Sequence, residues 1–220
     1  MTLRQPADGD QPAFHGVYPA VVTDIVDPDS LGRVQVRLPW LGEEGDRNMR
    51  FWATLCSPYA DADQGLLALP EVGSQVLVAF GAGNLSFPYV IGATWNGREA
   101  LPHQPEAANN VRLLRTRSDS RLEFDDTRGA EKVRITTASG HEVTLDNATQ
   151  SVTIRHAGGS TVKLTATGVE VTATTVTVSA ATVKVDAAMS TFTGVVKAAT
   201  FIADAMVTSP AYSPGAGNVW

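Results

Sequence analysis

Apolar and polar residues alternate over short stretches in the first half of the chain, as in Val34, Val36 and Leu38, which share one face of an extended segment. Strict alternation is typical of a β-strand with one buried face, and Gly, Pro, Asn and Asp separate the alternating stretches. The pattern predicts five or six short strands between residues 14 and 100, which favours a small closed or Greek-key β-barrel. The strands are expected at 15–26, 33–39, 50–57, 75–80 and 89–94.

Residues 111–208 follow a different pattern, in which Thr, Val and Ala dominate and Pro is absent. Apolar–polar–apolar triplets recur along this segment. The early triplets that start at Val143 and Val152 stand nine and ten residues before the next one, whereas the later triplets follow every seven residues. A repeat at fixed spacing indicates one structural unit per repeat. The regular part contains Val162, Leu164, Val169, Val171, Val176, Val178, Val183 and Val185.

A seven-residue period also occurs in coiled coils, where apolar positions are spaced alternately three and four apart. Here the spacing alternates between two and five. Residues two apart on a helix point about 200° apart, so no helix face would be apolar. Val and Thr also favour strands over helices. The repeat therefore predicts strands and argues against a coiled coil.

Each repeat offers only two aliphatic side chains for burial and spans about 23 Å when extended. A coil completed by one chain usually needs about 18 residues or more, so one repeat supplies a single side of a small prism. Three chains supply three sides, and they also close the strand edges that one chain would expose. We therefore predict an all-β protein that ends in an intertwined homotrimeric triangular β-helix, with the eight aliphatic residues named above as the trimer core. Folding and trimerisation should be one event.

Composition and turn residues divide the chain into five parts. We expect a flexible N-terminal arm at 1–13, the barrel domain at 14–100, a connector at 101–110, the needle at 111–208 and a C-terminal tip segment at 209–220. The last part breaks the repeat with two prolines and ends on an aromatic residue.

Charge and cysteine content exclude several classes of protein. Residues 1–110 carry six Arg and no Lys against thirteen acidic residues, which argues against a nucleic-acid partner because such affinity comes largely from basic side chains. A single cysteine, Cys56, rules out an intramolecular disulfide and suits a reducing compartment. Residues 1–14 lack the apolar core of a signal peptide, so we expect assembly in the bacterial cytoplasm. No apolar run approaches the roughly 20 residues that span a bilayer.

Residues that could act in catalysis or bind a metal are scattered rather than clustered. Cys56 stands in an alternating stretch and is expected to be a buried small residue. The neighbours Asp125 and Asp126 sit in turn chemistry, and adjacent strand residues point to opposite faces, so they do not form a catalytic pair. His141 and His156 have no metal-ligand spacing and are expected on the surface. We predict no enzyme activity, no metal site and no cofactor.

Two further features of the first half have both a structural and a functional interpretation. The segment 81–84 is glycine-rich, but no helix start follows it, so a hairpin loop is favoured over a phosphate cradle. An aromatic set resembles a stacking platform for single-stranded nucleic acid, but the acidic balance favours core filling. The set comprises Trp40, Phe51, Trp52, Phe80 and Trp95.

Several spaced motifs resemble the OB-fold domain of the phage baseplate protein V and VgrG-like spike family. They are GVYPAVV at 16–22, DPDSLGRVQVRLPW at 27–40, PEVGSQVLVAF at 70–80 and PYVIG at 88–92. The resemblance covers about 85 residues, and the segment 121–135 looks like the start of the family's triangular β-helix. It implies a structural spike of a contractile injection system: a phage tail baseplate, an R-type pyocin or an extracellular injection particle.

By the same resemblance, three OB domains dock on a baseplate hub protein at the end of the inner tube, and sheath contraction drives the needle through a target envelope, with transient contact to the target membrane. Two departures from the family matter. The ten-residue connector leaves no room for the lysozyme domain found in a larger phage relative, and no His-x-His pair is present to bind iron at the apex. A separate PAAR-type tip protein is therefore expected at the C-terminus. Its docking residues would be Tyr212, Pro214, Val219 and Trp220, although a frayed terminus is the alternative.

Two other functions fit parts of the pattern. A trimeric phage tailspike or adhesin also uses β-helices, but glycan-cleaving members need paired acids and roomy grooves. An OB-fold nucleic-acid module with a trimerising stalk is opposed by the charge.

Overall fold

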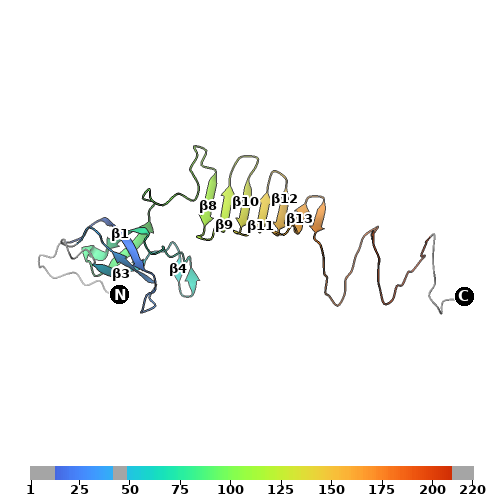
Figure 1. The fold of residues 1–220 in the computed structure, drawn as a ribbon, viewed down its shortest axis with the longest axis horizontal. Coiled ribbons are helices and arrows are strands. Elements are labelled where there is room, and N and C mark those ends of the chain that lie inside the picture. Colours follow the sequence, from blue (N-terminus) through green and yellow to red (C-terminus); the bar gives the residue numbers. More distant parts are fainter. Residues whose placement is uncertain (1–12, 42–48, 210–220) are drawn as a thin grey trace. The chain divides into compact units, whose positions relative to one another are not determined.

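The computed structural model describes residues 13–41 and 49–209 (Figure 1). Every regular element in these ranges is a β-strand except one short 3-10 turn, which confirms the predicted all-β class. The chain divides into two units, Met1–Ala173 and Thr174–Trp220. Among the described residues, no helix has the length and apolar character needed to cross a membrane.

Five strands of the first unit close into a barrel in the order β1-β2-β3-β7-β6, and β6 pairs back with β1, so the barrel has no free edge. Neighbouring strands run antiparallel except β3 and β7, which run parallel. Each strand lies within two residues of its predicted place. The bounds are β1 Val17–Asp24, β2 Arg33–Arg37, β3 Arg50–Leu55, β6 Gln75–Phe80 and β7 Pro88–Ala93.

The barrel encloses a complete apolar core. Because successive strand residues point to opposite faces, Val34, Val36 and Leu38 all point inward and are 0% exposed. Among the described residues, no polar or charged residue is buried as a whole, although the side chain of Asp27 is only 5% exposed. The core comprises Ala20, Val22, Val34, Val36, Leu38, Ala53, Val76, Val78, Phe80 and Val90.

The loop between β1 and β2 is organised by one carboxylate. Asp27 accepts backbone N–H groups from Asp29, Leu31 and Arg33, and its Oδ1 lies 2.7 Å from Arg33 Nη2. The Arg33 guanidinium holds the pKa of Asp27 well below its usual range, and the backbone N–H groups add to that effect. The DPDSLGR motif therefore encodes a loop that Asp27 and Arg33 fix in shape.

Two small elements carry no clear signal in the sequence. Strands β4 (Ala60–Asp61) and β5 (Gln64–Gly65) form a two-stranded hairpin between β3 and β6. The segment predicted as a hairpin loop forms the 3-10 turn η1 (Gly81–Gly83), which joins β6 to β7.

Seven further strands form an antiparallel sheet in which each strand pairs with the next along the chain (Figure 1). Turns of two to six residues connect them, which suits hairpins and makes the sheet a simple meander. The bounds are β8 Val111–Arg115, β9 Arg121–Asp125, β10 Lys132–Thr136, β11 Glu142–Asp146, β12 Ser151–Arg155, β13 Thr161–Thr165 and β14 Gly168–Thr172.

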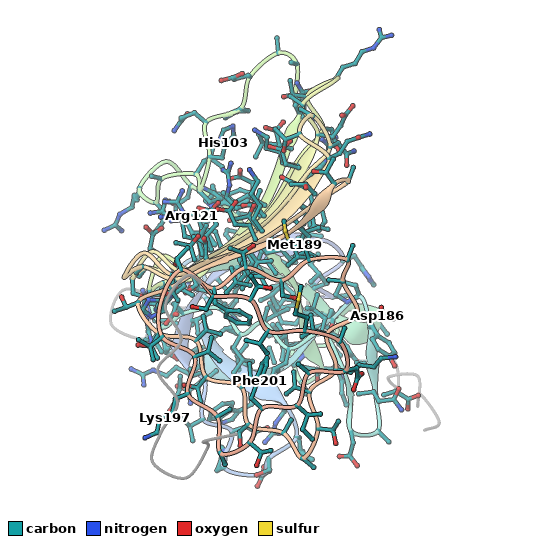
Figure 2. All side chains as sticks on the ribbon, turned by 90° about the vertical axis from the view of Figure 1, so that its right-hand side faces the viewer. His103, Arg121, Asp186, Met189, Lys197 and Phe201 are labelled. Carbon is teal, nitrogen blue, oxygen red and sulfur yellow. The ribbon has the colours of Figure 1, made fainter. Side chains whose placement is uncertain are left out.

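The second unit is different. No strand or helix is formed between residues 174 and 209, although this segment contains two of the four seven-residue repeats, those that start at Val176 and Val183. Figure 2 labels Asp186, Met189, Lys197 and Phe201 on it. Met189 and Phe201 are 81% and 73% exposed, which is unusual for such large apolar side chains.

Candidate subunit interface

One face of the seven-stranded sheet is apolar from β9 to β14, and its first strand, β8, adds Leu114 beside the charged Arg112. The register aligns side chains across strands, so that Ile135, Val143 and Ile154 stand side by side, and Val133, Leu145 and Val152 do the same in a parallel row. The apolar residues of this face are Leu114, Leu122, Phe124, Val133, Ile135, Val143, Leu145, Val152, Ile154, Val162, Leu164, Val169 and Val171.

This apolar face is open to solvent in the single chain. Leu114 is 61% exposed, Ile154 is 50% exposed and Val171 is 53% exposed. No residue described between 111 and 209 is buried. A contiguous apolar surface of this kind marks an interaction site, because a soluble monomer rarely leaves one uncovered.

The opposite face of the sheet is polar from β9 to β14 and carries ion pairs, whereas β8 contributes Val111 and Leu113 to it. Arg155 Nη2 lies 2.8 Å from Glu142 Oε2, and Arg134 Nη1 lies 3.2 Å from Glu123 Oε1. The Thr144 hydroxyl, followed by Arg155, holds the pKa of Glu142 below its usual value. Such ion pairs are stable in water, so this face can stay exposed to solvent. The sheet therefore has one solvated face and one apolar face.

The sheet contains half of the predicted trimer core. Val162, Leu164, Val169 and Val171 lie on its apolar face, in two neighbouring strands. The other predicted core residues belong to the second unit and are 62–70% exposed there; they are Val176, Val178, Val183 and Val185. Their place in an assembled core stays a prediction.

In residues 111–172 the strands pair differently from our expectation. We expected each strand of the repeat to pair with partner chains, but β8 to β14 all pair within one chain. The turns between these strands are long enough for the chain to reverse and satisfy its own hydrogen bonds. What the sheet lacks is therefore a cover for its apolar face, not partners for its inner strands.

Several single residues behave differently from prediction. Cys56 is exposed rather than buried. It stands three positions after Ala53, which points into the barrel, so in an extended chain it points outward. Of the aromatic set, Phe80 is in the core and Phe51 packs against it, whereas Trp95 is 64% exposed, so core filling does not account for it. Trp40 stacks on Tyr18 with ring centroids 4.6 Å apart and is partly exposed.

The carboxylates of Asp125 and Asp126 engage separate partners, as expected from turn chemistry. Asp125 accepts from the backbone and hydroxyl of Thr127, and Asp126 lies 3.0 Å from Arg112. His141 and His156 lie at the edge of the sheet, as expected for surface residues. Their ring centroids are 4.4 Å apart, a contact that the sequence did not predict. Within the described ranges, no group of three or more potential metal ligands is present. The residues proposed for tip docking, Tyr212, Pro214, Val219 and Trp220, lie outside the described residues.

Comparison with known proteins matches both halves of this architecture. Residues 18–95 match the type VI secretion system/phage-baseplate injector OB domain, which is the barrel. Residues 132–190 match the phage baseplate V C-terminal trimerisation domain, which includes most of the sheet and the start of the second unit. Both descriptions name structural domains of an injection apparatus, which agrees with the predicted structural role.

Curated relatives are spike proteins of type VI secretion systems. The chain is 23% identical to VgrG1b of Pseudomonas aeruginosa over 62% of its length, 26% identical to VgrG3 of Vibrio cholerae over 58%, and 28% identical to VgrG4b of P. aeruginosa over 60%. The matched part is only 13–20% of the length of these relatives. The two matches together show that the chain carries a type VI secretion system/phage-baseplate injector OB domain followed by a phage baseplate V C-terminal trimerisation domain.

Proposed function

We propose that three copies of this chain pack the apolar faces of their sheets together as the three sides of a prism, and that this homotrimer is the central spike of a contractile injection particle. The observation that carries the proposal is the uncovered apolar face that runs from β9 to β14, opposite a polar face. The match to a trimerisation domain sets the number of copies.

Burial on the prism axis supplies the driving force for assembly. An aliphatic side chain that goes from about half exposed to fully buried contributes roughly 1 kcal/mol. The face offers such side chains in two rows on every strand from β9 to β14. In the second unit, the seven-residue repeats continue the core by pairing with the other two chains, since no strand partner is available there within one chain.

The family resemblance suggests what this rod does. The barrel domains cap the inner tube through a baseplate hub protein, and a PAAR-type tip protein binds the C-terminal segment. Sheath contraction then drives the rod through the target envelope, with brief contact to its membrane. The particle is a phage tail, an R-type pyocin or an extracellular injection system, assembled in the bacterial cytoplasm.

Light scattering on the purified chain tests the assembly directly. The expected mass is about three times the 23.3 kDa of one chain. Ile154→Asp places charge on the apolar face and should abolish the trimer, because uncompensated buried charge is costly. Thr153→Asp, one residue away on the polar face beside Lys163, is the matched control and should stay trimeric. A monomeric wild-type protein would refute the proposal.

The spike role needs the intact particle. A cryo-EM map should show three copies at the end of the inner tube, with the barrels on the hub side. A map in which the protein decorates tail fibres would favour an adhesin instead.

A further inference from the structure

Two histidines from separate hairpin turns come together at one edge of the sheet. His141 closes the turn before β11, and His156 opens the turn after β12. The register pairs Glu142 with Arg155, which places the two histidines opposite each other just beyond the strand ends. Their ring centroids are 4.4 Å apart.

Both imidazoles accept hydrogen bonds from the backbone through the same ring atom. Ala157 N–H donates to His141 Nδ1 at 3.3 Å and so links one turn to the other. Gly158 N–H donates to His156 Nδ1 at 2.9 Å. A ring nitrogen accepts only when it carries no proton, so each of these two contacts requires an unprotonated Nδ1. Because backbone donors already engage both Nδ1 lone pairs, this geometry does not suit a metal ion bound at Nδ1.

Equivalent turns on the same edge use a side chain that does not titrate. The turns that begin at Thr116, Thr137 and His156 share one backbone geometry, in which the first residue donates its N–H to the carbonyl of the fifth. In the first two turns the Thr hydroxyl accepts the backbone N–H of the fifth residue, at 3.1 Å for Ser120 and 3.2 Å for His141. In the third turn, His156 replaces threonine as the side-chain acceptor.

The pair lies at the rim of the apolar face. By alternation along the strands, His141 is on the same side as Val143, and His156 is on the same side as Ile154. The charged neighbours in the register are Glu142 and Arg155, which bond each other at 2.8 Å on the opposite face, with Arg134 on the adjoining strand. No acid described in these turns faces the rings to stabilise a positive charge.

We propose that His141 and His156 form an acid-sensitive latch that joins two turns at the rim of the trimer interface. A histidine side chain ordinarily gains its proton near pH 6.5, so mild acidification is enough to change its charge. Protonation of Nδ1 removes the acceptor for Ala157 or Gly158 and places two cations in ring contact. The turns then separate, and the edge of the apolar face loosens. The link to assembly rests on the proposed trimer, whereas the latch itself does not.

Nitrogen NMR of histidine-labelled protein at pH 8 tests the latch in any oligomeric state. Two imidazoles should show the Nε2–H form, and both should convert to imidazolium on acidification together with faster amide exchange at Ala157 and Gly158. Protonated Nδ1 atoms at pH 8 would overturn the proposal even if the protein is trimeric.

Thermal unfolding at pH 8 and pH 5.5 tests the consequence. The wild type should lose roughly 5 °C between these pH values. The double variant His141→Asn/His156→Thr supplies acceptors that do not titrate and should lose less than half of that. His103→Gln removes a histidine of the connector and should behave as wild type. The carboxylates of Asp119, Glu142 and Asp146 stay ionised throughout, since their pKa values lie below their usual values. An equal loss in the double variant and the wild type would overturn the latch.

Discussion

In the barrel, five strands curve around ten apolar residues that are at most 7% exposed, whereas in the sheet seven strands carry a longer series of apolar residues that none of the described parts of the same chain buries. Both regions alternate apolar and polar side chains, and both satisfy their inner backbone groups. The difference is closure: β6 returns to β1, but β8 and β14 remain separate edges. Alternation alone therefore creates an apolar face, and topology decides whether one chain or several cover it.

The division has a mechanical consequence. A closed barrel keeps its shape before and after assembly, which suits a domain that docks. A sheet whose apolar face waits for partners gains rigidity only in the oligomer, so that the stiffness of the proposed needle is a property of three chains.

Separation of the two regions should give the largest effect. A chain that ends at residue 100 is expected to be monomeric and to unfold cooperatively, because its core is complete. Residues 101–220 alone should remain trimeric. Light scattering and circular dichroism on both fragments check this. A trimeric barrel fragment would show that the barrel carries an assembly surface of its own.

Charge in the second unit tests whether the repeats without secondary structure join the core. Val176→Asp should place three carboxylates in one narrow cross-section and cause loss of the trimer or a fall in melting temperature of more than about 10 °C. Thr177→Asp changes the polar position of the same triplet and should have little effect. Trimers of Val176→Asp as heat-stable as wild type would show that Val176 faces solvent after assembly.

A cavity in the barrel should have a large but separate effect. Leu38 is fully buried, so Leu38→Ala is expected to lower the free energy of unfolding of the barrel by about 2–5 kcal/mol. The trimer should persist. Leu31→Ala, at an exposed loop position, should change stability by no more than about 0.5 kcal/mol. Denaturant unfolding followed with light scattering separates the two readouts, and a loss of trimer in Leu38→Ala would contradict the independence of the regions.

Much of this comparison was predictable from the sequence. Alternation located every barrel strand, and turn residues located the loops, because a buried face imposes a period of two on the strand. The β4–β5 hairpin was missed, since strands of two residues show no period. Cys56 was misplaced because it lies one position past Leu55, and a shift of one residue moves a side chain to the other face.

The needle was predicted less completely because its pairing depends on turns. The triplets in β11 and β12 stand far enough apart to leave a four-residue turn, so these strands form a hairpin. The seven-residue period by itself does not indicate which strands pair within the chain. The contact between His141 and His156 is invisible without the register, since fifteen residues separate them in sequence. Once Glu142 is known to face Arg155, the histidine pair follows from antiparallel geometry.

Removal of the Asp27 carboxylate should destabilise the barrel in a pH-dependent way. Its pKa is lowered in the folded state, mainly by Arg33, so its contribution is present above the ordinary aspartate pKa and is lost only as the pH falls through the lowered value. Asp27→Asn should therefore melt several degrees below wild type at pH 7, with the gap closing in strong acid. Asp29→Asn removes only one contact to Arg33 and should cost less. A gap that stays constant down to pH 2 and below would mean that the ionised carboxylate is not the cause.

The smallest effect is expected on the polar face of the sheet, and it bears directly on which face is inside. Arg155 and Glu142 are 49% and 25% exposed in their side chains, so their ion pair should contribute only about 0.2–1 kcal/mol and should weaken with salt. Arg155→Gln, Glu142→Gln and the double variant form a cycle that measures the coupling in the trimer by thermal unfolding at low and high salt. A small, screened coupling agrees with a polar face in water. A coupling of several kcal/mol that salt does not change would indicate a desolvated pair, and then the polar face, not the row that contains Val143 and Ile154, would be the surface that the partner chains cover.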